Sequence, residues 1–137
     1  TILLHFDAVF ISPNTKIKYP FSELGLAPEV GSSYLLFQAL GYQQAAQLLF
    51  QSKIIDGTKY YELGLAKYVG DDFLDQANSY ARDLKEQSLS SIIETKAILK
   101  SFMSEDLAKA RSMETKAMKK LFGSEDNLKA VEKFFNK

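Results

Sequence analysis

Few side chains of this 137-residue sequence could serve as a nucleophile, a base or a metal ligand. The chain has no Cys and a single His, which excludes thiolate chemistry and zinc sites built from several His ligands. A Ser-His-Asp triad would have to use His5, which has no acidic or nucleophilic partner near it in the sequence, so a packed or surface histidine is expected.

Two carboxylates, Glu23 and Glu29, lie in the segment of residues 21–33, which reads FSELGLAPEVGSS. Its Gly and Pro residues disfavour regular structure before the first helix, and loops of this kind commonly carry sites. We expect the carboxylate of Glu29 to be desolvated by its apolar neighbours Leu26, Ala27 and Val30. Alternatively, Glu29 has no part in chemistry and is a carboxylate at the start of the following helix, where the helix dipole stabilises negative charge. If Glu29 acts as a base, Glu23 is its closest rival for that role, although a solvent-facing position is the simpler interpretation of Glu23.

The segment before this loop has an extended pattern. Residues 7–12 form an apolar run closed by Pro13-Asn14, which is typical of a buried strand, and residues 15–19 form a second extended piece. Two strands alone do not make a stable sheet and would leave edges exposed. The chain also begins inside an apolar run and without Met, so we expect it to be a fragment whose residues 1–19 pack against other polypeptide.

Helical spacing dominates from Gly31 onward, where Ser32 or Ser33 is expected to cap the first helix rather than act as a nucleophile. Apolar residues three or four apart, with capping residues before them, predict helices over residues 32–40, 43–51, 59–63, 72–86, 88–102, 104–121 and 124–135. Gly41 is expected to separate the first two of these helices. Residues 67–69 are a candidate for a short strand. The Lys- and Arg-bearing stretch 109–120 is expected to be a solvated helix face. The chain is thus predicted to be mostly α with a little β.

Bulk composition narrows the classes of partner. Seventeen Lys plus Arg balance seventeen Asp plus Glu, so neither nucleic acid nor an anionic membrane surface is favoured. The apolar runs are too short for a membrane-spanning helix. No secretory signal is visible, and the chain ends Phe135-Asn136-Lys137 without a peroxisomal Ser-Lys-Leu signal. We expect a soluble intracellular protein and leave its compartment, cytoplasm, peroxisome or mitochondrial matrix, open.

Four sequence motifs, in order along the chain, resemble the crotonase, or enoyl-CoA hydratase/isomerase, superfamily. They are Leu24-Gly25-Leu26-Ala27-Pro28 with Gly31-Ser32-Ser33; Ala39-Leu40-Gly41 with Ala46-Gln47-Leu48-Leu49; Glu62-Leu63-Gly64-Leu65-Ala66; and Ser124-Glu125-Asp126 with the end Ala130-Val131…Phe134-Phe135. The resemblance covers nearly the whole chain but only the C-terminal half of a family subunit. It implies an α/β fold in which residues 1–70 are the last part of a ββα spiral core and residues 71–137 form a helical region for assembly.

One position departs from the hydratases of this superfamily. They use two glutamates, and the second follows a Pro where this chain has Phe21 after Pro20. A phenyl ring cannot activate water, so hydration is disfavoured. Glu29, in Pro28-Glu29-Val30-Gly31, is instead similar in position to the catalytic glutamate of peroxisomal-type Δ3,Δ2-enoyl-CoA isomerases. The resemblance implies that Glu29 is the catalytic base and that Phe21 and Leu26 line the substrate pocket.

This reaction needs one base. The C2 proton of a 3-enoyl thioester is acidified by the carbonyl and by the double bond, so one carboxylate can remove it and return it to C4. The expected function is conversion of 3-enoyl-CoA to trans-2-enoyl-CoA in fatty-acid oxidation, with no cofactor and no metal. Two alternatives stay open: another crotonase reaction, hydratase-like or hydrolytic, and a non-catalytic helical assembly fragment.

The resemblance also implies partners. Phe134 and Lys137 share a helix face and match an aromatic residue and a Lys that reach the adenine and phosphates of CoA in hydratase relatives, although a core Phe beside an exposed Lys is the simpler account. A homotrimer or hexamer is expected. The donors that hold the thioester oxyanion lie in the N-terminal half of the fold, so the present chain alone should be inactive.

Overall fold

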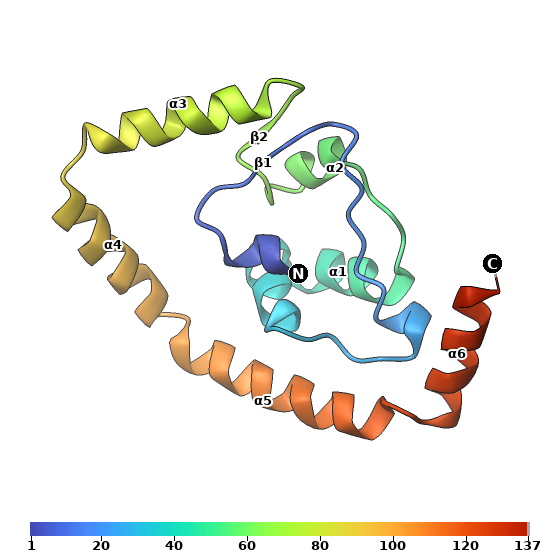
Figure 1. Ribbon diagram of the computed structural model, residues 1–137. Helices are drawn as coiled ribbons and strands as arrows, with labels where there is room; N and C mark the ends of the chain where they lie inside the picture. Colours follow the sequence, from blue (N-terminus) through green and yellow to red (C-terminus); the bar gives the residue numbers. More distant parts are fainter. Residues whose placement is uncertain (137) are drawn as a thin grey trace.

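The first seventy residues form the packed part of the molecule. The computed structural model describes residues 1–136, of which most are helical. Its first elements are η1 (Ile2–His5), β1 (Phe10–Ile11), η2 (Ser22–Leu24), α1 (Ser32–Gln51), α2 (Gly57–Glu62) and β2 (Tyr68–Val69). Here η marks a short 3-10 helix. Figure 1 shows α1 and α2 gathered with the two strands on one side of the molecule.

The sheet is small and parallel. Phe10 pairs with Tyr68 and Ile11 with Val69, so the strand expected at residues 67–69 is confirmed. The strand expected over residues 7–12 is shorter than predicted, because β2 offers only two residues for pairing. The extended piece 15–19 forms no strand, and only Ile17 pairs there, in an antiparallel bridge to Ile55.

The core lies between these extended segments and the two helices. Buried residues from the start of the chain pack with residues of α1, α2 and the loop before β2; the cluster is Val9, Ile11, Ile17, Tyr19, Phe21, Leu36, Ala45, Tyr60 and Ala66. Burial, with Tyr60 beside it, raises the pKa of Tyr19 above its ordinary value. Residues 1–19 thus bury four side chains, Val9, Ile11, Ile17 and Tyr19, within this chain itself, and their packing against further polypeptide stays a prediction.

Helix α1 contains a break. Gly41 has φ 72° and ψ 171°, which is not helical, so the span is two helices joined at a kink. This confirms the break predicted there, since glycine adopts a positive φ without a steric penalty. Within residues 1–136, no helix is both long and apolar enough to cross a membrane.

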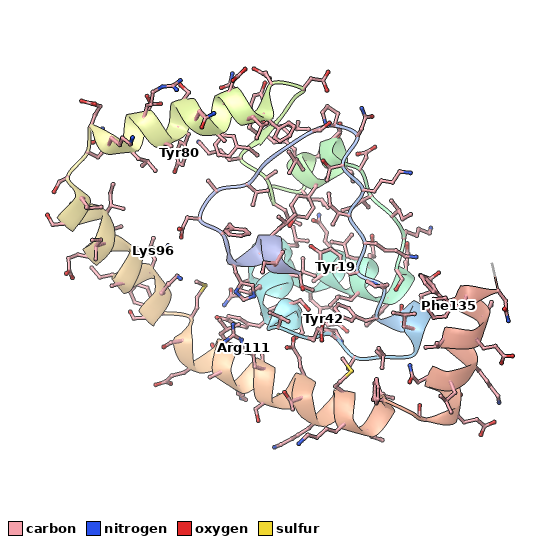
Figure 2. All side chains as sticks on the ribbon, in the orientation of Figure 1. Tyr19, Tyr42, Tyr80, Lys96, Arg111 and Phe135 are labelled. Atoms are coloured by element: carbon pink, nitrogen blue, oxygen red, sulfur yellow. The ribbon has the colours of Figure 1, made fainter. Side chains whose placement is uncertain are left out.

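Four further helices form an arc around the packed part (Figure 1). They are α3 (Phe73–Lys85), α4 (Leu89–Ser101), α5 (Ser104–Leu121) and α6 (Glu125–Phe135). Their predicted positions are confirmed to within a few residues, because local caps set their starts: the Ser88 and Ser124 side chains accept the N–H groups of Ser91 and Asn127. Tyr80 of α3 packs its ring against Phe10, with centroids 5.5 Å apart (Figure 2).

Helix α6 is fastened to the loop that precedes α1. The amide of Asn127, 5% exposed, donates to the carbonyl of Leu24 at 2.6 Å and accepts the N–H of Gly123 at 2.9 Å. Gly25 has φ 65°, and a Cβ there would lie 2.9 Å from the Cα of Asn127. This close approach requires glycine at position 25.

Asn127→Ala should lower the free energy of unfolding of the full-length protein by about 1–3 kcal/mol, because the two hydrogen bonds of the buried Asn127 side chain, to the Leu24 carbonyl and from the Gly123 N–H, are lost. Chemical denaturation followed by circular dichroism measures the change. Asn78→Ala on α3 is the matched control, since its side chain is exposed and it has the same gain in helix propensity. Equal stability changes in the two variants would contradict this anchoring role.

Candidate functional site

The turn from Glu29 to Ser33, here called the base turn after the base predicted at Glu29, joins the loop after η2 to α1. Val30 has φ 58° and Gly31 φ 75°, both left-handed. A β-branched residue rarely adopts this conformation, and such strain costs about 1–3 kcal/mol and persists only where surrounding contacts fix it. Ser32 contributes locally, donating its N–H at 3.0 Å and its hydroxyl at 2.7 Å to the carbonyl of Glu29.

A buried carboxylate from α5 holds the base turn from one side. Glu114 is 6% exposed and accepts the N–H of Gly31 on Oε2 at 2.7 Å. Its Oε1 accepts both the N–H of Ser33 at 3.0 Å and the Ser33 hydroxyl at 2.6 Å. These donors belong to the start of a helix, where N–H groups lack intrahelical partners. Glu114 therefore caps α1 from a distance of more than eighty residues in sequence.

This contact corrects two expectations. Neither Ser32 nor Ser33 caps α1 with its own oxygen, since both hydroxyls donate to other acceptors and Gly31 is the N-cap residue. Residues 109–120 are also not merely a solvated face, because Glu114 lies buried among them. The sequence held one signal of this: Glu114 falls seven residues after Leu107 and so lies on the apolar stripe of α5.

A histidine holds the base turn from the other side. Nε2–H of His5, in η1, donates to the carbonyl of Val30 at 2.8 Å. The side chain is partly buried, so the expectation of a packed or surface histidine is compatible with this position, but its contact with the base turn was not predicted. The strained residue is thus fixed through its own carbonyl and through the N–H of the next residue.

Helix α5 approaches the base turn closely at Gly31. A Cβ at this residue would overlap Cδ1 of Leu107 and lie 3.6 Å from Nε of Arg111. Leu107, Arg111 and Glu114 follow one face of α5, so one helix face supplies both the packing and the hydrogen bonds. Figure 2 shows Arg111 on the side of α5 that faces the first part of the chain.

Glu29 itself is exposed, which corrects the expectation that its neighbours desolvate it in this chain. Ala27 is buried, but Leu26 is only partly buried and Val30 is 45% exposed. Glu23 is partly buried and forms an ion pair with Lys18. Of the two loop carboxylates, Glu29 is thus the one that lies at the strained turn.

Phe21 and Leu26, which are predicted to line the substrate pocket, are joined by a backbone hydrogen bond. The N–H of Leu26 donates to the carbonyl of Phe21 at 2.8 Å, which closes the loop around η2. The ring of Phe21 is 7% exposed and belongs to the core. The position at which the family resemblance predicts a carboxylate in hydratases is thus a packed aromatic ring in this chain. The pocket assignment of Phe21 and Leu26 stays a prediction.

Phe134, one of the two predicted CoA contacts, lies at the end of α6. Phe134 is 39% exposed, its ring is perpendicular to that of Phe135 with centroids 5.6 Å apart, and Nζ of Lys18 lies 5.8 Å from its centroid. Lys137 lies outside the described residues, so its assignment is unchanged. An exposed aromatic ring can stack on a ring-shaped ligand, and the CoA role of Phe134 stays a prediction.

A cavity of about 800 Å³ lies between η1 and the helices α3, α4 and α5. His5, Leu107 and Arg111 line it, so it adjoins the base turn, and Lys96 borders it while binding Asp7 at 2.5 Å (Figure 2). Within residues 1–136, no three His, Cys, Asp or Glu side chains gather as metal ligands would. The expected absence of a metal or cofactor stays a prediction.

Gly31→Ala should destabilise the full-length protein by about 2–4 kcal/mol, because it adds an overlap with Leu107 to the cost of a left-handed alanine. Gly64→Ala is the matched control: its φ is 76° but nothing lies within 4 Å of the added Cβ, so only about 1–2 kcal/mol is expected. Thermal and chemical denaturation measure both. Similar losses in the two variants would show that α5 does not press on the base turn.

Comparison with known proteins gives a consistent picture. The family model for enoyl-CoA hydratase/isomerase matches residues 1–137. YhaR of Bacillus subtilis, described as an enoyl-CoA hydratase/isomerase, is 29% identical over 115 residues, which cover 82% of this chain and 45% of YhaR. Peroxisomal enoyl-CoA delta isomerase 3 of Mus musculus is 36% identical over 69 residues, 50% of this chain and 22% of the mouse protein.

A solved structure agrees with these sequences. The enoyl-CoA hydratase/isomerase of Pseudoalteromonas atlantica has a TM-score of 0.91 at 26% identity, over 98% of this chain and 55% of that one. The predicted fold class, the C-terminal half of a crotonase-type α/β fold that is mostly helical in this chain, is confirmed. The chain spans about half the length, or less, of the relatives it matches.

Proposed function

Because the chain belongs to the enoyl-CoA hydratase/isomerase family, we propose that it carries the single base, Glu29, of an isomerase that converts 3-enoyl-CoA to trans-2-enoyl-CoA. One observation carries this proposal. Glu29 lies on a strained, doubly held turn, whereas Phe21, at the position of the hydratase carboxylate, is packed into the core. The similarity to a mouse protein described as an enoyl-CoA delta isomerase also supports it.

The chemistry follows from one carboxylate. Glu29 removes the proton at C2 of the 3-enoyl thioester, and the electron pair of the C–H bond forms a C1–C2 double bond while the carbonyl π pair moves to the thioester oxygen. When the carbonyl re-forms, the C1–C2 pair becomes the C2–C3 double bond and the old C3–C4 double bond accepts the proton at C4. The intermediate is a dienolate whose charge lies on the thioester oxygen. The same carboxyl group returns the proton, so no water is added and no cofactor is consumed.

The dienolate needs hydrogen-bond donors on its oxygen, and such donors commonly give the largest share of catalysis. We propose that they come from the part of the fold that this family has in addition to the present chain, since the chain covers 55% of the matched structure. We also propose that the full-length protein works as a homotrimer or hexamer. Catalysis is therefore to be measured on the full-length protein.

Glu29→Gln keeps the size and hydrogen-bonding capacity of the side chain but removes the base. The kcat for isomerisation of 3-enoyl-CoA by the full-length protein should fall by about 10⁴-fold or more, the upper range of general base catalysis. Folding and CoA binding should change little, because the side chain is exposed.

Glu23→Gln is the matched control for this substitution, since Glu23 lies in the same loop but is paired with Lys18. It should keep kcat within about threefold. Equal activity of Glu29→Gln and wild type would remove Glu29 from the mechanism. Loss at Glu23 instead would favour the hydratase-like alternative, as would hydration of 2-enoyl-CoA by the wild type.

Phe134→Leu tests the proposed CoA contact. Stacking of a base on an aromatic ring is worth about 1–3 kcal/mol, so KM for the CoA ester should rise by about tenfold with kcat unchanged. Phe122→Leu is the control, because Phe122 is also exposed, at 74%, but lies at the end of α5. An unchanged KM in Phe134→Leu would show that this ring has no part in CoA binding.

A further inference from the structure

We propose that Glu114 is a positioning residue for the base Glu29, an inference that rests on the proposed function. The carboxylate of Glu114 binds the N–H of Gly31 and two donors of Ser33, at distances from 2.6 to 3.0 Å. Gly31 is two residues after Glu29. Glu114 thus fixes the segment of backbone from which the base extends, although it does not touch the reacting atoms.

The arrangement is specific for a carboxylate. Three donors converge on two oxygens, and the side chain is 6% exposed, so water does not supply alternative acceptors. Glutamine in the same place would offer one acceptor oxygen and turn an NH2 group toward one of these donors. A buried group with a mismatched partner is costly, so the turn would shift to avoid it.

Capping alone does not require a remote residue. Helices α2, α4 and α6 in this chain are capped locally, by Asp56, Ser88 and Ser124, each bonding an N–H three residues on. Helix α1 has two serines at its start, yet Ser33 turns its hydroxyl to donate to Glu114. A cap supplied from α5 couples the base turn to the helical arc, which a local cap would not do.

The contact also determines which hydrogen-bond donors are available to the carboxylate of Glu29. The first N–H groups of a helix stabilise a nearby anion, and an anion so bonded is a weaker base. Glu114 occupies the N–H groups of Gly31 and Ser33. In the described part of the chain, the Glu29 carboxylate makes no hydrogen bond to these donors. Glu114 therefore keeps these two N–H groups from binding the carboxylate of Glu29.

Glu114→Gln in the full-length protein tests this role with 3-enoyl-CoA as substrate, at a temperature where circular dichroism shows the variant to be folded. A displacement of the base by about 1 Å can cost roughly 10²-fold, so kcat should fall by about that factor while KM stays within about threefold. Glu105→Gln, an exposed carboxylate on the same helix, is the matched control and should leave both constants unchanged.

Ser33→Ala provides a second measurement, because it removes one donor to Glu114 and leaves the backbone donors in place. Its kcat should fall by about threefold to tenfold. The double variant Glu114→Gln/Ser33→Ala should have a kcat within about twofold of Glu114→Gln alone, since both changes act on one contact. If Glu114→Gln does not fold, the kcat of Ser33→Ala tests the positioning role instead.

The outcomes separate this inference from the proposed function. An unchanged kcat in Glu114→Gln, with or without lowered thermal stability, overturns the positioning role when Glu29→Gln is inactive. An unchanged kcat in Ser33→Ala overturns it likewise if only that variant folds. Full activity of Glu29→Gln overturns the proposed function itself, whatever Glu114 does.

Discussion

The hydrogen bonds between the Glu114 carboxylate and the start of α1 are the contact on which the candidate site depends. Burying a carboxylate costs several kcal/mol unless donors replace its water, and free N–H groups at a buried helix start are costly as well. Here the N–H groups of Gly31 and Ser33 replace water around the carboxylate, and the carboxylate supplies the acceptor that these N–H groups lack. The same face of α5 also brings Leu107 against Gly31, where an added Cβ would overlap the Cδ1 atom of Leu107.

The contact of Glu114 with Gly31 helps to keep Val30 in a strained backbone conformation. A β-branched residue at φ 58° would relax if its neighbours were not fixed, and here η1, through His5, and α5, through Glu114, both hold it. Helix α6 holds the same loop further upstream, through Asn127 and Leu24. The helical arc, which the family resemblance connects with assembly, therefore also shapes the loop that carries Glu29.

Features that depend on neighbouring residues could be predicted from the sequence, whereas features that depend on contacts distant in the sequence could not. Caps such as Ser88 and Ser124 and the break at Gly41 depend on neighbouring residues, so the helices were predicted within a few positions. Both strands left local signals, at residues 7–12 and 67–69, but the parallel pairing of β1 with β2 joins residues that are distant in the sequence, so neither signal predicts it. Glu114 contacts residues more than eighty positions away, which periodicity marks only as a charge on an apolar face. The exposure of Glu29 depends on how the whole turn is placed, and flanking apolar residues do not determine it.

Amide hydrogen exchange at Gly31 and Ser33, resolved by fragmentation mass spectrometry on the full-length protein, tests the central contact most directly. If the buried carboxylate holds the base turn, both amides exchange slowly in the wild type. In Glu114→Gln the Gly31 amide then exchanges at least about tenfold faster, while the Ile17 and Ile55 amides of the distant bridge keep their rates. Fast exchange at Gly31 in the wild type, or equal rates in the two proteins, would contradict the account.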